Sequence, residues 1–440
     1  MKLEMICTGE EVLAGQIVDT NAAWLGNQLM DAGFEMQRRT TVGDRLADLV
    51  EVFKERSLCA DIILVNGGLG PTADDLSSLA MAEAMSVELQ ENAQWRSILV
   101  QWFEQRGIGL SQSNLKQALL PQGAVMVDNP VGTACGFRVK LNRAWLFFTP
   151  GVPHEFKQMV TEQFMPFVKA HSEQKNSVTV TKLLTLGMGE SPMAELLERE
   201  IWPAGITLGY RSYTPYLELK LIARSVTDQA MQLAVMQAKK LLGDTVVAQN
   251  KNTLAAKVHE MLVQSKKRLA VAESLTGGEI CAQLVAFAGS SAYLKHGVVS
   301  YCNEAKMQIL KVPSTVIEQH TEVSLECVAQ MAIGTANLAV IESVTESMTE
   351  SCEYALATSG VAGPSGGTEA IPVGTVVIAV KAHDKVYTQK IAISANRSRT
   401  YIRNLATAVA LDMLRRAILN QEPIAKYDYI KSVEQQVFDV

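Results

Sequence analysis

Short apolar runs alternate with amphipathic segments along residues 1–170. A run of five or six apolar residues is typical of a buried strand, and apolar residues spaced three and four apart are typical of a helix. On this basis we expect strands at residues 3–8, 34–42 and 61–65 and helices at residues 22–32 and 45–56, the first helix capped by Asn21. Strands that alternate with helices predict a first domain with a mostly parallel sheet and helices on both faces.

The pattern changes after a polar run at residues 173–176. A helix is expected to start at Ser191, with the serine as N-cap and Pro192 at the first helical position. The remaining expected elements are strands at 178–186, 206–211 and 216–222 and a helix at 228–242. Their order, β-α-β-β-α, predicts a small α+β middle domain over residues 173–248.

Strands and helices alternate again from residue 250 onward. The expected strands are 269–272, 297–301, 354–358, 373–380 and 385–393, and the expected helices are 253–264, 279–287, 304–310, 326–339 and 398–419. This alternation predicts a third domain of the α/β class over residues 250–420. The residues after Pro423 show no clear pattern, so residues 421–440 are expected to form a C-terminal tail.

Ser274 lies at a predicted strand-to-helix junction. It follows the apolar run 269–272, and the sequence TGG leads from it into the helix 279–287. A hydroxyl at such a junction faces the crevice at the carboxyl ends of the strands, where α/β folds bind ligands. Free N–H groups of the new helix can hold an anion or a developing oxyanion there. Ser274 is therefore a candidate nucleophile; the alternative is a serine that only caps the helix.

Lys306 is the candidate base. Asn303 is a suitable N-cap for the helix 304–310, which would place Lys306 in the first turn, near the positive end of the helix. The dipole and burial both disfavour the charged form of a lysine, and a neutral lysine can activate a serine. The alternative is a solvated surface charge. Cys302 is expected to be a buried or semi-buried spectator, because nothing nearby clearly acts as its base.

A glycine-rich motif, NGGLGPTADD at residues 66–75, directly follows the apolar strand 61–65. Its glycines let the backbone approach a phosphate closely, and its aspartates can hold a hard cation or orient a water. The alternative is a glycine turn with two acids at a helix start, where acids are favoured anyway. Glu10 and Glu11 are alternative metal ligands. The candidate residues of the motif are Gly67, Gly68, Gly70, Asp74 and Asp75.

Composition narrows the possible partners. The 440 residues carry a formal net charge of −6 with no block of like charge, which argues against a nucleic-acid surface. No apolar run approaches the roughly 20 residues that span a bilayer, and the N-terminus lacks the apolar core of a signal peptide. Seven cysteines without a Cys-x-x-Cys pair suggest reduced thiols. We therefore expect a cytoplasmic protein with no membrane partner.

Three motifs of the third domain resemble the C-terminal domain of the CinA family: AESLTGG (272–278), GSSAYLKHGVVSYCNEAK (289–306) and TSGVAGPSGGTEAIPVGTV (358–376). That domain is similar to the nicotinamide mononucleotide amidohydrolases, which release ammonia and form nicotinate mononucleotide. The resemblance implies Ser274 as nucleophile with Tyr301 and Lys306 as the proton-handling pair, and no cofactor. The substrate-binding residues that it implies are Thr276, Gly277, Ser359, Gly360, Gly363 and Arg397, the last on the substrate phosphate.

This chain departs from the usual family pattern in three places of the third domain. Leu275 stands where cysteine is common, Ile371 replaces a lysine, and Ala395-Asn396-Arg397 stands where Gly-Asp-Arg is common. The first change should be tolerated. The other two bear on substrate binding and leave the nucleophile in place.

Four motifs within residues 1–165 resemble the N-terminal domain of the same family: TGEEVLAGQIVDTN (8–21), SQSNLKQALLP (111–121), NPVGTACGF (129–137) and TPGVPHEF (149–156). That three-layer domain is similar to molybdopterin-binding domains, and in several members it is linked to hydrolysis of the ADP-ribose pyrophosphate. The resemblance implies a divalent metal on Asp74 and Asp75, cobalt or magnesium, with potassium as an optional further ion. The implied site consists of Gly67, Gly68, Gly70, Thr72, Asp74, Asp75, Glu10 and Asp19.

The middle domain is distantly similar to KH modules, but the Gly-x-x-Gly loop of those modules is not evident. It is interpreted as a spacer or dimerisation module, so a homodimer is expected. The leading interpretation is a bifunctional enzyme of pyridine-nucleotide recycling, a nicotinamide mononucleotide amidase with an N-terminal ADP-ribose pyrophosphatase. The alternatives are a non-catalytic nucleotide-binding protein associated with competence or DNA damage, and a molybdopterin-binding protein suggested by fold analogy.

Overall fold

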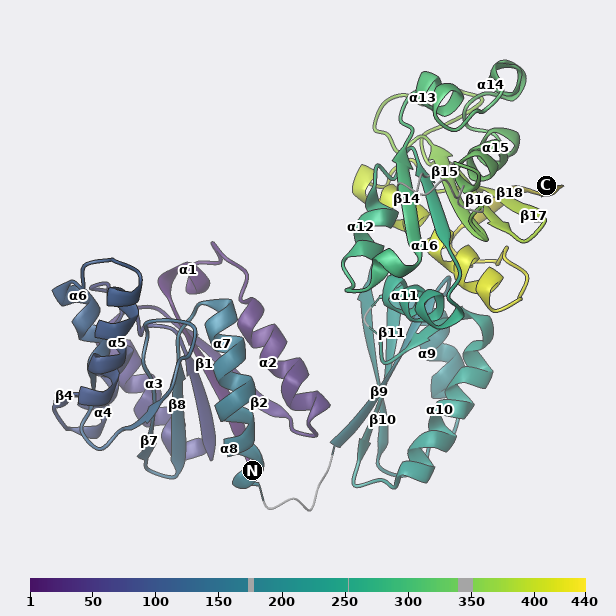
Figure 1. Cartoon of the computed structure of the whole chain (residues 1–440). Helices are drawn as coiled ribbons and strands as arrows, with labels where there is room; N and C mark the ends of the chain where they lie inside the picture. Colours follow the sequence, from purple (N-terminus) through teal and green to yellow (C-terminus); the bar gives the residue numbers. More distant parts are fainter. Residues whose placement is uncertain (173–177, 252, 339–350) are drawn as a thin grey trace. The chain divides into compact units, whose positions relative to one another are not determined.

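The computed structural model describes residues 1–172, 178–251, 253–338 and 351–440 (Figure 1). The chain divides into two compact units, residues 1–180 with 223–225 and residues 181–222 with 226–440. The segments expected to form the middle and third domains thus belong almost entirely to one unit. The polar run 173–176 and the last residue of the expected helix 326–339 lie outside the described residues. Within the described ranges, no helix is long and apolar enough to cross a membrane.

A six-stranded sheet of order β2-β1-β3-β8-β7-β6 forms the centre of the N-terminal unit. The first four strands of this order are parallel to one another. Strand β7 is antiparallel to β8, and β6 is antiparallel to β7. The strands are β1 (Leu3–Thr8), β2 (Met36–Val42), β3 (Ile62–Asn66), β6 (Val125–Val127), β7 (Gly136–Leu141) and β8 (Ala144–Thr149). A separate pair joins β4 (Leu89–Glu91) to β5 (Leu119–Pro121).

Helices cover both faces of this sheet because its central strands are apolar on both sides. On one face Ile63 packs in a core with Phe53 of α3, and on the other Leu64 packs in a core with Leu25 of α2. The helices are α1 (Glu10–Leu13), α2 (Thr20–Asp31), α3 (Leu46–Cys59), α4 (Ser77–Met85), α5 (Ala93–Gln105), α6 (Gln112–Leu115), α7 (Pro153–Met159) and α8 (Met165–Ala170).

The start of α2 differs from the prediction. Asp19 caps the helix, and its carboxylate accepts a hydrogen bond from the N–H of Ala22 at 2.9 Å. Asn21 lies inside the helix, where its amide donates to the carbonyl of Gly151 at 2.8 Å and to Asn66 Oδ1 at 3.3 Å. Both residue types are good caps. The long-range partners of Asn21 decide between them.

The second unit contains a four-stranded sheet of order β10-β11-β9-β12. Its elements are β9 (Val178–Leu186), α9 (Glu190–Glu198), β10 (Ile206–Tyr213), β11 (Tyr216–Arg224), α10 (Asp228–Leu242) and β12 (Val246–Gln249). The predicted N-cap of α9 is Ser191, but the helix starts at Glu190. Gly189 is its N-cap, and the carbonyl of Gly189 accepts a hydrogen bond from the N–H of Met193 at 3.2 Å. Ser191 and Pro192 therefore lie inside the first turn.

The same unit contains a six-stranded sheet of order β14-β13-β15-β16-β17-β18. Strand β13 is parallel to both of its neighbours, and the last three strands are antiparallel. The strands are β13 (Leu269–Glu273), β14 (Leu294–Val299), β15 (Tyr354–Gly360), β16 (Thr375–Ala382), β17 (Lys385–Ala392) and β18 (Lys431–Asp439). The helices are α11 (Leu254–Ser265), α12 (Glu279–Val285), α13 (Asn303–Gln308), α14 (Ser314–His320), α15 (Leu325–Ala336) and α16 (Arg399–Ile418).

Two core clusters enclose this sheet. Leu356 and Ile378 belong to one cluster with Leu405 of α16, whereas Ala357 and Val377 belong to the other cluster with Met331 of α15. The alternation of side chains along β15 and β16 thus buries both faces. Helix α16 is buried along most of its length, and Figure 1 shows it in yellow beside the strands.

The expected C-terminal tail is wrong for residues 431–439. These residues form β18, which pairs with β17 through partners such as Gln435 and Gln389. Most side chains of β18 are exposed, so the apolar pattern of the segment is weak. The strand forms because β17 offers it a free edge, and such an edge is set by the fold of the whole domain.

Candidate active sites

Ser274 lies where the topology of the C-terminal sheet places a ligand crevice. It directly follows β13, whose neighbours β14 and β15 lie on opposite sides of it. In open α/β sheets such a point, at the carboxyl ends of the parallel strands, is the usual ligand site. The backbone N–H of Ser274 donates to the carbonyl of Thr358 at 3.0 Å, which ties the end of β13 to β15. Ser274 is 7% exposed.

A cavity of about 370 Å³ opens at this point. Six of the nine residues predicted for this site line it: Ser274, Tyr301, Lys306, Ser359, Gly360 and Gly363. The structure therefore brings together residues that are up to 89 positions apart in the sequence, from Ser274 to Gly363. Thr276, Gly277 and Arg397 are not among the lining residues.

Lys306 is 2% exposed although it carries an ionisable group. Its ammonium makes no hydrogen bond or ion pair with any described residue. Burial lowers the pKa of Lys306 from its ordinary value, and the negative charge of Glu322 opposes the shift without cancelling it. The expected N-cap of its helix is wrong: α13 starts at Asn303 itself and Cys302 occupies the cap position. The lowered pKa therefore comes mainly from burial. Cys302 is exposed at the cap position, so the expectation that it is buried or semi-buried is also wrong.

Tyr301 is 64% exposed at the rim of the cavity. Its hydroxyl accepts a hydrogen bond from Nη2 of Arg399 at 3.2 Å, and Nη1 of Arg399 donates to the carbonyl of Gly363 at 2.8 Å. Arg399 thus joins Tyr301 to the SGVAGP loop. The predicted Arg397 lies elsewhere, with its guanidinium 4.8 Å from the ring centroid of Tyr401. Arg399, which the sequence analysis did not single out, is the arginine that lines the cavity.

The start of α12 is occupied by a protein carboxylate. Glu273 is fully buried and accepts hydrogen bonds from the N–H groups of Gly278, Ile280 and Cys281 at 2.9, 3.1 and 3.0 Å. The expectation that these N–H groups face the crevice unpaired is therefore wrong. In the described part of the chain the N–H of Leu275 makes no hydrogen bond, and Leu275 lines the cavity. The N–H of Thr276 is also unpaired among the described residues, but Thr276 does not line the cavity, so the N–H of Leu275 is the candidate oxyanion donor at this turn.

Three other predicted substrate-binding residues make hydrogen bonds within the protein around the cavity. Thr276 is fully buried, and its hydroxyl lies 2.8 Å from the hydroxyl of Thr358. Gly277 has φ +63°, and its N–H donates to the carbonyl of Ser274 at 3.1 Å, which closes the turn. The hydroxyl of Ser359 donates to the carbonyl of Glu322 at 2.7 Å. These groups position Ser274 and the SGVAGP loop.

The N-terminal unit has its own cavity, of about 510 Å³, at the carboxyl ends of β1, β3 and β8. Strand β1 has β2 on one side and β3 on the other, so this too is a point where the chain direction across the sheet reverses. Six predicted residues line it: Gly67, Gly68, Gly70, Asp74, Asp75 and Asp19. Glu10 and Thr72 do not, whereas Glu11 and Asp44 do.

Glycine is required in the 66–75 motif for steric reasons. At Gly67, φ is +111° and a Cβ would lie 2.8 Å from the carbonyl oxygen of Thr8; at Gly70 a Cβ would lie 2.5 Å from the carboxylate of Asp75. That carboxylate accepts hydrogen bonds from the N–H of Thr72 at 2.8 Å and from its hydroxyl. The loop is therefore ordered around Asp75.

The carboxylates of this cavity lie close enough to raise the pKa of Asp44 by charge repulsion. Burial raises the pKa of Asp44, and the charges of Glu11, Asp74 and Asp75 add to the rise. Asp19 caps α2 and lies 3.5 Å from Arg39. Among the described residues, no group of three or more His, Cys, Asp or Glu side chains is arranged to hold a metal ion. The carboxylates can thus supply one or two ligands, as magnesium needs when phosphate oxygens supply others.

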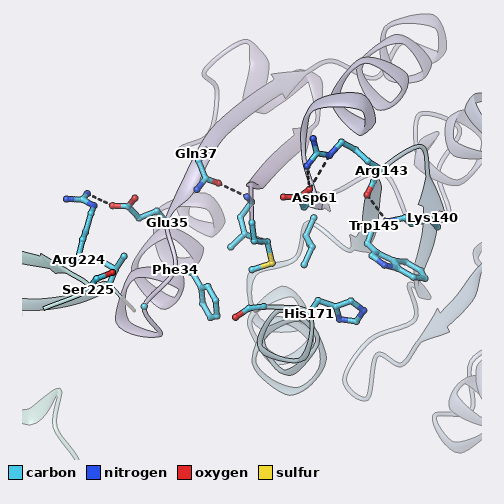
Figure 2. A pocket seen from close by; sticks show the side chains of 16 residues that line it. Phe34, Glu35, Gln37, Asp61, Lys140, Arg143, Trp145, His171, Arg224 and Ser225 are labelled. Atoms are coloured by element: carbon cyan, nitrogen blue, oxygen red, sulfur yellow. Dashed lines mark hydrogen bonds and ion pairs between the residues drawn. The ribbon is translucent and has the colours of Figure 1, made fainter. Parts of the chain in front are cut away.

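A third cavity, of about 760 Å³, lies at the opposite, amino end of the N-terminal sheet (Figure 2). Figure 2 shows Asp61 paired with Arg143 there, and Asp61 also accepts from the N–H of Lys2 at 2.7 Å. None of the predicted site residues lines it. Because ligands of α/β sheets bind at the carboxyl ends of strands, this cavity is the weaker candidate.

Comparisons with known proteins match two separate parts of the chain. The family model for the probable molybdopterin binding domain matches residues 4–170, and the model for the CinA C-terminal domain matches residues 251–418. A CinA-like protein of Shewanella halifaxensis (strain HAW-EB4) is 55% identical over 437 residues, 99% of this chain and 100% of that protein. One of Shewanella sediminis (strain HAW-EB3) is 57% identical over 429 residues, 97% of this chain and 98% of that protein.

Solved structures match a smaller part of the chain. The CinA protein of Thermoplasma acidophilum is 30% identical, covers 38% of this chain and 96% of its own, and has a TM-score of 0.35. The competence/damage-inducible protein of Agrobacterium tumefaciens is 32% identical, covers 38% and 93%, and has a TM-score of 0.34. On the two domain models and on more than half identity across nearly the whole length, this α/β chain belongs to the family of CinA-like proteins.

Proposed function

We propose that the C-terminal cavity hydrolyses the carboxamide of nicotinamide mononucleotide. The observation that carries the proposal is a buried lysine, Lys306, that has no side-chain partner among the described residues and lines the cavity that also holds Ser274. A buried ammonium without a counter-ion is costly, and such lysines are typical of sites that need a neutral amine. The amine is then free to take the proton of the serine hydroxyl.

The reaction would run through an acyl-enzyme. Lys306 takes the proton of Ser274 as Oγ attacks the carboxamide carbon, and the N–H of Leu275 stabilises the oxyanion. The C–N bond breaks when the proton reaches the leaving nitrogen, and Tyr301 at the rim relays it. Ammonia leaves, and a water then cleaves the ester to give nicotinate mononucleotide and free Ser274.

Arg399 is the proposed anchor of the substrate phosphate. A guanidinium matches a phosphate bidentately, and it keeps its charge at every working pH. Two of its nitrogens donate to Tyr301 and to the carbonyl of Gly363. These bonds hold the side chain at the cavity rim, so its position is set before the substrate arrives.

The test is incubation of the whole protein with nicotinamide mononucleotide. The proposal predicts ammonia and nicotinate mononucleotide in equal amounts, with no loss of rate in EDTA. Release of free nicotinamide in place of ammonia would mean that the glycosidic bond is cleaved, which would refute the amidase.

The N-terminal cavity favours a second activity, hydrolysis of the ADP-ribose pyrophosphate. Its specific support is a glycine loop beside several carboxylates at the carboxyl ends of parallel strands. Asp74 and Asp75 would hold a divalent cation together with the substrate phosphates; the cation supplies neutralisation of the charge that develops on phosphate oxygens. Formation of AMP and ribose 5-phosphate from ADP-ribose, dependent on added magnesium or cobalt, tests this proposal.

A further inference from the structure

Glu322 is a carboxylate of the C-terminal cavity that the amide chemistry above does not use. Of the described residues that line this cavity, it is the only Asp or Glu. Its side chain makes no hydrogen bond or ion pair with any described residue. The carboxylate is therefore available to a ligand.

The backbone around Glu322 is held in place. Its carbonyl accepts the hydroxyl of Ser359 at 2.7 Å. Ser324 caps α15 by accepting from the N–H of Cys327 at 3.1 Å, and the hydroxyl of Ser324 donates to the carbonyl of Thr321 at 2.9 Å. These bonds fix the segment that presents the carboxylate to the cavity.

The negative charge of Glu322 affects the pKa values of neighbouring groups in the cavity. It opposes the lowering of the Lys306 pKa, and it adds to the rise of the Cys327 pKa. A carboxylate that only raised the pKa of the base would work against catalysis, because the base must be neutral. A second charge that meets Glu322 when substrate is bound would resolve this conflict.

The substrate class supplies that charge. A pyridine ring bonded to ribose through its nitrogen is a cation, whereas the phosphate at the other end of the mononucleotide is an anion. The cavity offers the complementary pair, Glu322 and Arg399. We infer that Glu322 is a specificity-determining residue that recognises the positive charge of the pyridinium ring and so selects oxidised pyridine mononucleotides over neutral isosteres. This inference rests on the proposed amidase function.

The experiment compares two amide substrates on the whole protein. One is nicotinamide mononucleotide, and the other is the mononucleotide of benzamide riboside, whose ring has the same shape and no charge. Ammonia release gives kcat/KM for each on the wild type, on Glu322→Gln and on the matched control Glu326→Gln. Glu326 lies on α15, 3.7 Å from His320, and does not line the cavity.

Glu322→Gln should lower kcat/KM for nicotinamide mononucleotide about tenfold, the scale of a partly screened charge pair. The benzamide substrate should change less than threefold, and Glu326→Gln should change neither. Most of the loss should appear in KM. An equal fall for both substrates, with or without a shift of the pH–rate curve, would overturn the inference and leave Glu322 a positioning residue. No ammonia from either substrate with the wild type would instead refute the amidase.

Discussion

At the scale of single residues, the proposed amide hydrolysis depends on the protonation state of Lys306. The side chain is removed from water, and burial lowers its pKa. Only the neutral amine can accept a proton, so activity should rise with pH through the pKa of Lys306. That midpoint should lie below about 10.4, the ordinary value for lysine. A pH–rate profile of ammonia release measures it.

Lys306→Arg should be nearly inactive, with a loss of at least about a hundredfold, because a guanidinium keeps its proton. The control is Lys311→Arg, at an exposed lysine just beyond α13, which should retain full activity. Substantial activity of Lys306→Arg would show that position 306 supplies charge alone, and the base would have to be another group.

The two arginines of the RSR sequence allow a direct comparison. Arg399→Lys should raise KM for nicotinamide mononucleotide about tenfold, because a lysine cannot hold the phosphate bidentately. Arg397→Lys should leave KM within about twofold, because that side chain lies on the ring of Tyr401. Steady-state kinetics on the two variants checks both statements. The reverse ranking would restore Arg397 as the phosphate anchor.

Most of the residues predicted for the C-terminal site line its cavity, because their motifs are local. The sequence selected Arg397, whereas Arg399 lines the cavity, because the two arginines flank the N-cap Ser398 of α16 and only packing separates them. It also did not identify Glu322, which lies just before the N-cap Ser324 of α15 and has no motif of its own. Glu322 lines the cavity only because segments far apart in the chain come together there.

At the scale of elements, Glu273 links β13 to α12. A strand residue that accepts three helix N–H groups satisfies donors that would otherwise be unpaired and places a negative charge at the positive helix end. The turn that contains Ser274 lies between these two elements. The position of Ser274 is thus held from both sides.

Glu273→Gln should destabilise the protein by about 2 kcal/mol, because an amide is a weaker acceptor and its NH₂ group faces N–H donors. Differential scanning calorimetry should show a lower Tm. The control Glu279→Gln replaces the carboxylate that accepts from Gln283 within α12 by an amide oxygen and should cost less than about 0.5 kcal/mol. Hydrogen exchange at Gly278 and Ile280 should quicken in Glu273→Gln alone; unchanged exchange would mean that the carboxylate does not hold the helix start.

Element prediction succeeded where apolar periodicity was strong and failed where distant partners decide. The strands β3 and β13 are continuous apolar runs, and both were expected within one residue of their observed bounds. Strand β18 has few apolar residues and forms by pairing with β17. The paired residues are far apart in the sequence, as Gln435 and Gln389 are, at 46 positions. The N-cap of α2 likewise depends on Gly151 and Asn66.

At the scale of the whole molecule, the two cavities belong to different compact units. Their proposed reactions also need different chemistry, a neutral amine in one and charge neutralisation of a pyrophosphate in the other. Ser274→Ala should therefore leave ADP-ribose cleavage unchanged. The double variant Asp74→Asn/Asp75→Asn should lose that cleavage by at least about a hundredfold and retain ammonia release.

EDTA should reproduce the effect of the double variant. It should stop ADP-ribose cleavage and spare amide hydrolysis, and added magnesium or cobalt should restore the former. Parallel assays of AMP and ammonia on the same preparation would show this division. Loss of ammonia release in EDTA, restored by metal, would contradict a metal-free amidase.

The most direct test of the central claim is ammonia release from nicotinamide mononucleotide by the wild type and by Ser274→Ala, side by side. The account predicts steady turnover by the wild type and a loss of at least about a thousandfold in the variant, with its fold intact by calorimetry. Turnover by Ser274→Ala near the wild-type rate would contradict the assignment of Ser274 as nucleophile.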